Sequence, residues 1–185
     1  MKNVIHIFGG SGSGTTTLGK KICDELGYFH MDTDNYYWLP TEQKYTAKRP
    51  PEERLRLMLQ DIQTHEHVVI SGSLTDWGDT LIPHFTLAIR IDIDPALRIE
   101  RLVAREKERY GRRIEPDGDH YPQHLEFVAW AKSYDTGGVE IRSKAKHDAW
   151  QTLLCCPLLR LNGSNTLEEK FAQVKRALEQ QASAQ

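Results

Sequence analysis

Apolar and polar positions follow one another along this chain in two alternating patterns. The segments 3–8, 28–32, 67–72, 85–93 and 157–163 are short and rich in β-branched or aromatic residues, which is typical of strands. Between them lie segments with helical spacing, such as 15–26, where Leu18, Ile22 and Leu26 recur every four positions. The same reasoning predicts helices over 50–65, from Pro95 to about Tyr110, over 121–150 with a break at the two glycines 137–138, and from residue 166 onward.

Strands that alternate with helices predict an α/β fold with a doubly wound, mostly parallel sheet. A length of 185 residues suits one domain with a sizeable core, so we expect a single domain over 1–185. We expect only the tail QQASAQ, residues 180–185, to be frayed.

Composition narrows the range of partners. The net charge of −2 gives no overall basic field, so we do not expect binding to nucleic acid. The apolar runs are too short for a transmembrane helix, so we expect no membrane partner. The chain enters a strand at once, which leaves no room for a signal peptide, and its three cysteines form no disulfide framework. We therefore expect a cytoplasmic protein.

The stretch FGGSGSGTTTLGKK, residues 8–21, has the glycine spacing of a Walker A loop, G-x-x-x-x-G-K-[ST]. Thr16 occupies the Ser/Thr position and can offer its hydroxyl to Mg²⁺, but Thr15 stands where the lysine belongs. A strand, a glycine loop and a helix N-terminus bring backbone N–H groups to one point and attract an anion without any side chain. An ordinary glycine-rich turn is the alternative. We expect phosphate-binding residues at Gly9, Gly10, Ser11, Gly12, Ser13, Gly14, Thr15, Thr16 and Thr17.

The longer stretch GGSGSGTTTLGKKICDELGYFHMDTDNYYW resembles the start of the nucleoside-monophosphate kinase and shikimate kinase group of P-loop proteins. Its GSGTTT run resembles the loop of certain cytidylate-kinase-like proteins, in which threonine also occupies the lysine position. The resemblance covers most of the chain and is weakest over 36–50. It implies a P-loop NTPase three-layer sandwich, with a five-stranded parallel sheet, helices on both faces and a lid. It also implies ATP and Mg²⁺ as cofactors and a small-molecule phosphoryl acceptor.

Five arginines of the helix from Pro95 fall on one stripe at helical spacing: Arg98, Arg101, Arg105, Arg109 and Arg112. The stripe could reach phosphates, or it could be a solvated face paired with neighbouring glutamates. Arg101-Leu-Val-Ala-Arg105 resembles the R-x-x-x-R at the start of the adenylate kinase lid. The resemblance implies that Arg101 stacks on adenine, that Arg105 contacts phosphates, and that a helical lid covers about 109–150. It also implies that Arg142 reaches the transferred phosphoryl group, so these arginines would replace the lysine; Lys48 and Arg49 are weaker candidates.

Asp32 and Asp34 follow the second strand in HMDTDNYYW. Two carboxylates at a strand end can hold Mg²⁺ and act as general base toward an acceptor hydroxyl. Alternatively, one aspartate caps a short helix. The pair resembles the D-x-D of shikimate and gluconate kinases and the Asp-aromatic stretch of uridine-kinase-like proteins. Ser71 stands where many P-loop proteins have a magnesium-binding aspartate, and its hydroxyl could serve a bound phosphate or substrate.

These patterns predict an ATP-dependent kinase, a phosphotransferase that acts on a small acceptor. The expected catalytic residues are Arg105, Arg142, Asp32 and Asp34, and the expected metal-binding residues are Thr16 and Asp32. A nucleoside monophosphate is the first expectation for the acceptor. A hydroxyl-bearing metabolite is the alternative that the two aspartates favour. A nucleotide-binding module with little turnover is the alternative that the absent lysine favours.

Overall fold

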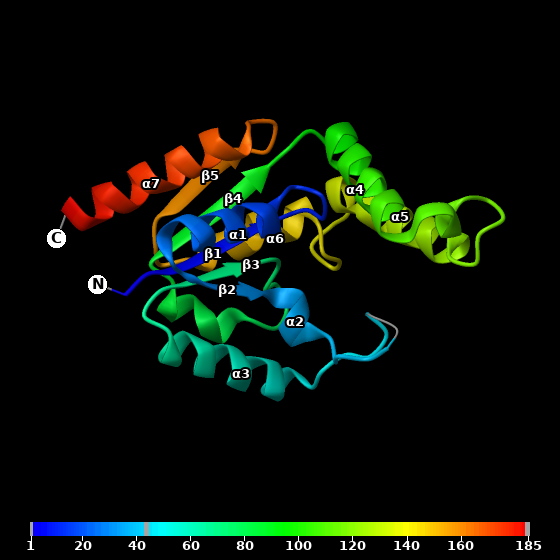
Figure 1. Cartoon of the computed structure of the whole chain (residues 1–185). Helices are drawn as coiled ribbons and strands as arrows, with labels where there is room; N and C mark the ends of the chain where they lie inside the picture. The colour runs from blue at the N-terminus through cyan, green and yellow to red at the C-terminus, as the bar shows by residue number, and fades with distance from the viewer. Residues whose placement is uncertain (1, 43–44, 184–185) are drawn as a thin grey trace.

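A computed structural model describes residues 2–42 and 45–183 of the protein. Its centre is a five-stranded sheet in the order β2-β3-β1-β4-β5, in which every neighbouring pair is parallel (Figure 1). The predicted parallel α/β sheet is therefore confirmed. The strands are β1 (Val4–Gly9), β2 (Phe29–Asp32), β3 (Val68–Ser71), β4 (Leu87–Asp92) and β5 (Leu158–Asn162).

Most helices lie within a few residues of where the helical spacing predicts them; the short helix over 33–37 was not predicted from spacing and matches only the alternative in which an aspartate caps a short helix. The helices are α1 (Thr15–Leu26), α2 (Thr33–Tyr37), α3 (Pro51–Thr64), α4 (Pro95–Tyr110), α5 (Tyr121–Thr136), α6 (Lys144–Trp150) and α7 (Leu167–Ser183). The expected frayed tail is wrong for residues 180–183, which continue α7, and residues 184–185 lie outside the described chain. The side chain of Gln181 donates a hydrogen bond of 2.9 Å to the carbonyl oxygen of Thr86, which ties this last turn to the body of the protein.

Helices cover both faces of the sheet, so the molecule has three layers. On one face, Ile5 and Ile7 of β1 pack with residues of α1 and α7. On the other face, Val4 and Phe8 of the same strand pack with residues of α3 and α6. This alternation follows from the two-residue period of a strand that is buried on both faces.

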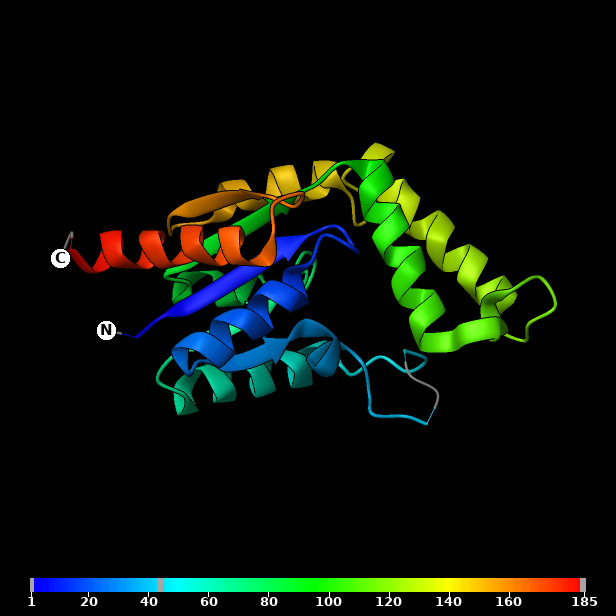
Figure 2. The same cartoon turned by 45° about the horizontal axis from the view of Figure 1, so that its top comes forward.

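The carboxyl ends of the parallel strands all lie at one edge of the sheet, and two features extend beyond that edge. Helices α4 and α5 form an arm on one side, and the described residues after α2, 38–42 and 45–50, lie opposite them (Figure 2). An antiparallel bridge joins Trp38 to Lys48 in these residues. Within the described ranges, no helix combines the length and the apolar character that crossing a membrane requires.

Candidate active site

The phosphate loop lies at the carboxyl end of the central strand β1. Gly12 and Gly14 have φ angles of 91° and 94°, a left-handed conformation that favours glycine. Gly14 precedes α1 and provides no side chain to cap it, so the first N–H groups of α1 remain for another acceptor. Residues 9–17 thus have the backbone arrangement of an anion-binding loop, with a helix dipole pointing its positive end at the same place.

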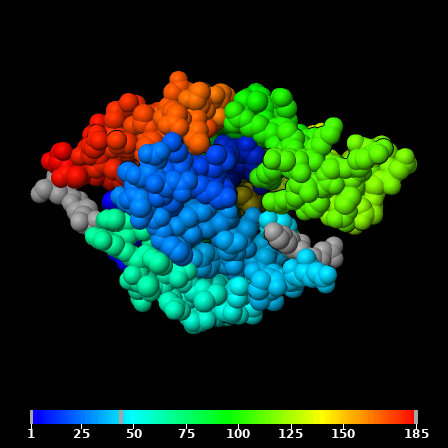
Figure 3. Space-filling view, in the orientation of Figure 1, coloured from blue at the N-terminus to red at the C-terminus, as the bar shows by residue number. Residues whose placement is uncertain are grey.

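A hollow opens in front of this loop. In the space-filling view it lies between α1 and the α4–α5 arm, and dark blue atoms of the N-terminal part of the chain are visible at its floor (Figure 3). Ligands of open parallel sheets bind beyond the carboxyl ends of the strands, and the hollow is in that position.

Thr16 and Asp32 meet at the mouth of the loop. The Thr16 hydroxyl donates a hydrogen bond of 3.2 Å to Oδ2 of Asp32. Oδ1 of the same carboxylate accepts a bond of 3.0 Å from the N–H of Asp34 and caps α2. The metal-site and cap interpretations of Asp32 are therefore compatible, because each uses a different oxygen. One hydroxyl and one carboxylate suit Mg²⁺, which normally completes its octahedron with phosphate oxygens and water.

Asp34 lies between opposing charges. Burial raises the pKa of its carboxyl group, and the neighbouring Asp32 raises that pKa further. Arg142, Arg105 and Arg109 act in the opposite direction, which places all three guanidinium groups within electrostatic range. The predicted Arg105 and Arg142 therefore both lie within electrostatic range of Asp34, although the three residues come from separate segments of the sequence.

The arginine stripe of α4 divides into different environments. Arg98 is only 1% exposed, so the expectation that it lies on an open phosphate-facing row is wrong. Its Nη1 donates instead to the carbonyl oxygen of Ser11 at 2.8 Å. Arg112 lies beyond the end of α4, in the short helical turn Gly111–Ile114, and its side chain is 95% exposed. Helical spacing predicts which residues share a face of α4. It does not predict which other segments contact that face, and these differ from one end of the helix to the other.

Arg101 and Arg109 have contacts on opposite sides of the hollow. Arg101 donates a hydrogen bond of 2.8 Å to the carbonyl oxygen of Gly163, in the turn after β5. Arg109 lies 5.9 Å from the ring centre of Tyr45, in the segment after α2. Arg101 therefore lies on the β5 side, away from the Asp32–Asp34 pair that follows β2.

Arg142 lies on the connection between α5 and α6. It lines a small crevice with Ser11, Trp130, Ala131 and Tyr134, which places it beside the phosphate loop. Its Nε is buried and has no hydrogen-bond partner, and among the described residues no carboxylate is within ion-pair distance of it. Burial lowers the pKa of its guanidinium, and Asp34 opposes that shift. Because an arginine remains charged in proteins, the site contains a partly buried cation that is not neutralised by an ion pair.

Another buried arginine was not singled out from the sequence. Arg54 of α3 is 5% exposed, and its guanidinium carbon lies 3.8 Å from the ring centre of Tyr37 and 5.6 Å from that of Trp77. Its Nε donates to the carbonyl oxygen of Arg49, and no carboxylate in the described chain pairs with it. The available signal is its spacing, since Arg54 shares the buried face of α3 with Met58 and Ile62.

Two other residues that the sequence suggested for the site, Ser71 and Arg49, are hydrogen-bonded to other residues of the protein. The Ser71 hydroxyl is fully buried and lies 2.9 Å from Nε2 of His30, so it does not have the expected role of a free donor for phosphate. Arg49 donates to the carbonyl oxygen of Tyr36 and pairs with Glu53 at 2.8 Å, which removes it as a source of the missing charge. Lys48 is exposed, with Nζ 5.8 Å from the Tyr37 ring centre.

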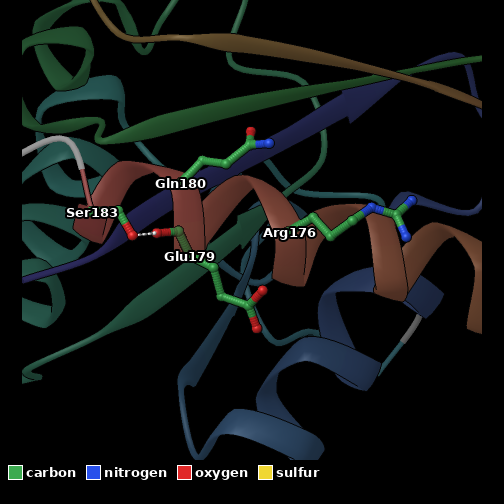
Figure 4. Close-up of a pocket in the computed structure, with 4 residues that line it drawn as sticks. All are labelled: Arg176, Glu179, Gln180 and Ser183. Carbon is green, nitrogen blue, oxygen red and sulfur yellow. Dashed lines mark hydrogen bonds between the residues drawn. The ribbon is translucent and has the colours of Figure 1, made fainter.

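A shallow depression on α7 offers no comparable site. Its lining residues Arg176, Glu179, Gln180 and Ser183 all come from one helix (Figure 4). The Ser183 hydroxyl donates to the carbonyl oxygen of Glu179, a contact within the helix. Side chains from separate elements converge at the end of β1 and not here.

Known proteins resemble this chain to different degrees. No protein-family model matches the chain. It is 41% identical to the uncharacterized protein YqaC of Bacillus subtilis over 174 residues, which are 94% of this chain and 96% of that protein. It is 34% identical to a cytidylate kinase of Pyrococcus horikoshii over 115 residues, 57% of this chain and 58% of that protein. It is also 25% identical to a uridine kinase of Oceanobacillus iheyensis, covering 71% of this chain and 82% of that protein.

Solved structures share the fold at low sequence identity. A shikimate kinase from Bacteroides thetaiotaomicron superimposes with a TM-score of 0.58 at 16% identity, covering 96% of this chain and 98% of that one. A gluconokinase from Sinorhizobium meliloti gives 0.55 at 16% identity, covering 99% and 94%. The molecule has the P-loop kinase fold, and by its similarity over nearly the whole length of both proteins the chain belongs to the family of YqaC from Bacillus subtilis.

Proposed function

We propose that the protein is a kinase that transfers the γ-phosphoryl group of Mg-ATP to a small acceptor. The observation that carries this proposal is the convergence of Thr16, Asp32, Asp34 and Arg142 on the open end of the phosphate loop. P-loop phosphoryl transfer depends on positioning and on electrostatic stabilisation, and those are the contributions that these groups can make.

In this proposal the amides of residues 10–15 bind the β-phosphate, while Thr16 and Asp32 hold Mg²⁺. The metal neutralises charge on the phosphates when it is bound. Arg105 and Arg142 face the transferred phosphoryl group, and Arg142 supplies the charge that Thr15 lacks. Arg101 lies on the nucleoside side, and residues of about 109–150 act as a lid that excludes water.

The acceptor that Asp34 favours is a hydroxyl group. A hydroxyl must lose a proton when it attacks, and Asp34 is a carboxylate beside the loop that is hydrogen-bonded through its backbone to Asp32. Burial and Asp32 raise its pKa, which brings the carboxyl group closer to the operating pH of a general base. Arg54, buried and without an ion-pair partner in the described chain, supports an acceptor that also bears an anionic group.

A nucleoside monophosphate is the second candidate, and the arginines favour it. Three guanidinium groups lie within electrostatic range of Asp34, and such groups bind phosphate oxygens well. They belong to Arg105, Arg109 and Arg142. Such an acceptor already carries a nucleophilic phosphate and needs no base. The partial similarity to a cytidylate kinase supports this candidate as well.

A product assay tests both candidates. The protein and Mg-ATP are incubated with AMP, CMP, UMP, dTMP, shikimate, gluconate or uridine, and the products are separated by chromatography. D34N should lower turnover of a hydroxyl acceptor by about 10²–10⁴-fold, the usual contribution of a general base. It should change turnover of a monophosphate far less. Asp24→Asn on the exposed side of α1 is the control and should leave the rate unchanged.

The pH profile provides a second test. Because the pKa of Asp34 is raised, the acid limb of kcat/KM for a hydroxyl acceptor should lie above the ordinary carboxylate value of about 3.9. If no acceptor is phosphorylated faster than free phosphate is released, the proposal of a kinase for these acceptors is wrong.

A further inference from the structure

Arg98 is anchored to the phosphate loop rather than to the ligand space. Its Nη1 donates to the carbonyl oxygen of Ser11 at 2.8 Å. Its Nη2 donates to the carbonyl oxygen of Ala131 at 2.7 Å and forms an ion pair with Asp135 at 2.5 Å. One guanidinium group therefore joins the loop to α5, and its charge is balanced by a carboxylate of α5.

The loop fits closely against this arrangement. A Cβ added to Gly12 would lie 2.5 Å from the backbone oxygen of Arg98. A Cβ added to Gly10 would lie 2.8 Å from Cε1 of Tyr134 and 3.1 Å from Cδ of Arg98. The first part of the loop is thus pressed against α4 and α5, and these two glycines leave the space that the contact requires.

Arg98 and Arg142 differ in how their charges are paired. Arg98 has an ion pair with Asp135, whereas no carboxylate of the described chain lies within ion-pair distance of Arg142. The Nε of each arginine is buried without a hydrogen-bond partner, so the ion pair is what distinguishes them. A neutralised guanidinium orients its neighbours, and an unneutralised one is available to an anion. Both arginines lie beside Ser11 but are suited to different tasks.

We infer that Arg98 is a positioning residue of the phosphate loop. It holds the Ser11 carbonyl group from outside, so that a loop with no lysine is already in its binding conformation and is coupled to α5. The part that concerns turnover rests on the proposed kinase function, whereas the part that concerns loop order and anion binding does not.

The experiment compares wild type with R98K and R98M. Lysine keeps the charge and most of the stem, but a single ammonium group cannot reach Ser11, Ala131 and Asp135 together. The matched control is R90K, because Arg90 is also fully buried but pairs with Asp92 and Asp148 and not with a residue of the loop. Three quantities are measured: thermal stability, amide hydrogen exchange of residues 9–14, and the Kd of Mg-ADP by calorimetry.

R98K and R98M should speed amide hydrogen exchange of residues 9–14. They should also weaken the binding of Mg-ADP at least tenfold, which corresponds to about 1.4 kcal/mol. R90K should lower thermal stability without either effect. Once an acceptor is known, R98K should raise KM for ATP more than it lowers kcat, since Arg98 touches no reacting atom.

Two outcomes would overturn the inference. Loop exchange and Mg-ADP affinity of folded R98K could match wild type, or R90K could change both as much as R98K does. Neither result depends on turnover, so a failure of this inference is distinct from a failure of the kinase proposal, which the acceptor panel and D34N decide.

Discussion

Replacing Arg142 by methionine should make the protein more stable and, at the same time, much less active. Methionine keeps a long flexible side chain and removes the guanidinium. In the folded protein Nε of Arg142 is buried without a partner, and burial lowers the pKa of the group. An unsatisfied buried donor costs about 1–3 kcal/mol.

Part of that cost is offset in the wild type. The Arg142 guanidinium lies 5.6 Å from the Trp130 ring centre, and such a cation–π contact contributes about 0.5–1 kcal/mol. Attraction to Asp34 adds a further stabilising contribution. We therefore expect R142M to gain about 1 kcal/mol, which raises Tm by about 2–4 °C in a protein of this length.

Activity should change in the opposite direction. Removal of one preorganised donor costs about 10²–10³-fold in kcat, and arginines that stabilise a transferred phosphoryl group are worth about 10³–10⁵-fold. We expect a loss of at least about 10²-fold for R142M in the acceptor assay. R142K should recover part of it, because the charge is kept and the planar fork is lost.

Calorimetric unfolding gives Tm for each variant, and the product assay gives its kcat. R112M is the control, since Arg112 is 95% exposed as a side chain and should affect neither quantity. If R142M lowers Tm and leaves kcat within a factor of about three, Arg142 is a structural residue and the explanation of the missing lysine is incorrect.

Three further changes test other parts of the site. T16V removes the hydroxyl that bonds Asp32 at 3.2 Å and should weaken the apparent Mg²⁺ affinity about tenfold in a metal titration; an unchanged affinity would place the metal elsewhere. G10A should lower the free energy of unfolding in urea by about 1–3 kcal/mol, because its Cβ would lie 2.8 Å from Tyr134. G27A is the comparison: Gly27 has a positive φ but open space around it, so its substitution measures backbone strain without overpacking. Burial lowers the pKa of His147 to about 3. Below the ordinary histidine pKa of about 6.5, the unfolded state therefore binds more protons than the folded state. The free energy of unfolding should fall by up to about 1.4 kcal/mol per pH unit as the pH drops from about 6.5 to about 3. In H147Q, pH-dependent unfolding should lack this part of the decrease.

The parallel sheet could be predicted because its determinants are local. Each strand is a short β-branched run, and each helix has apolar residues at the right spacing or a start signal. The capping box of Thr166 and Glu169 is an example, since both of its reciprocal hydrogen bonds are present in the structure. The glycine loop is equally local, because Gly9 and Gly14 have fixed spacing between a strand and a helix.

The roles of individual arginines could not be read in the same way. Arg98 and Arg105 share a stripe of α4, yet one is buried against Ser11 and the other is exposed within electrostatic range of Asp34. What they face is decided by α5 and by the loop, which are distant in sequence. Arg54 was missed for a related reason, because a charged residue on an apolar helix face gains meaning only from Tyr37 and Trp77 around it.

The order of the strands gives the phosphate loop and the Asp32–Asp34 pair different structural support. The phosphate loop follows β1, which has a hydrogen-bonded strand on both sides, whereas Asp32 and Asp34 follow β2, which pairs with β3 alone. Changes near Asp32 and Asp34 therefore disturb one neighbouring strand, while changes at the loop disturb two. Under the proposed kinase function, substitutions in the edge strand β2 can therefore change the acceptor while the central loop after β1 is preserved.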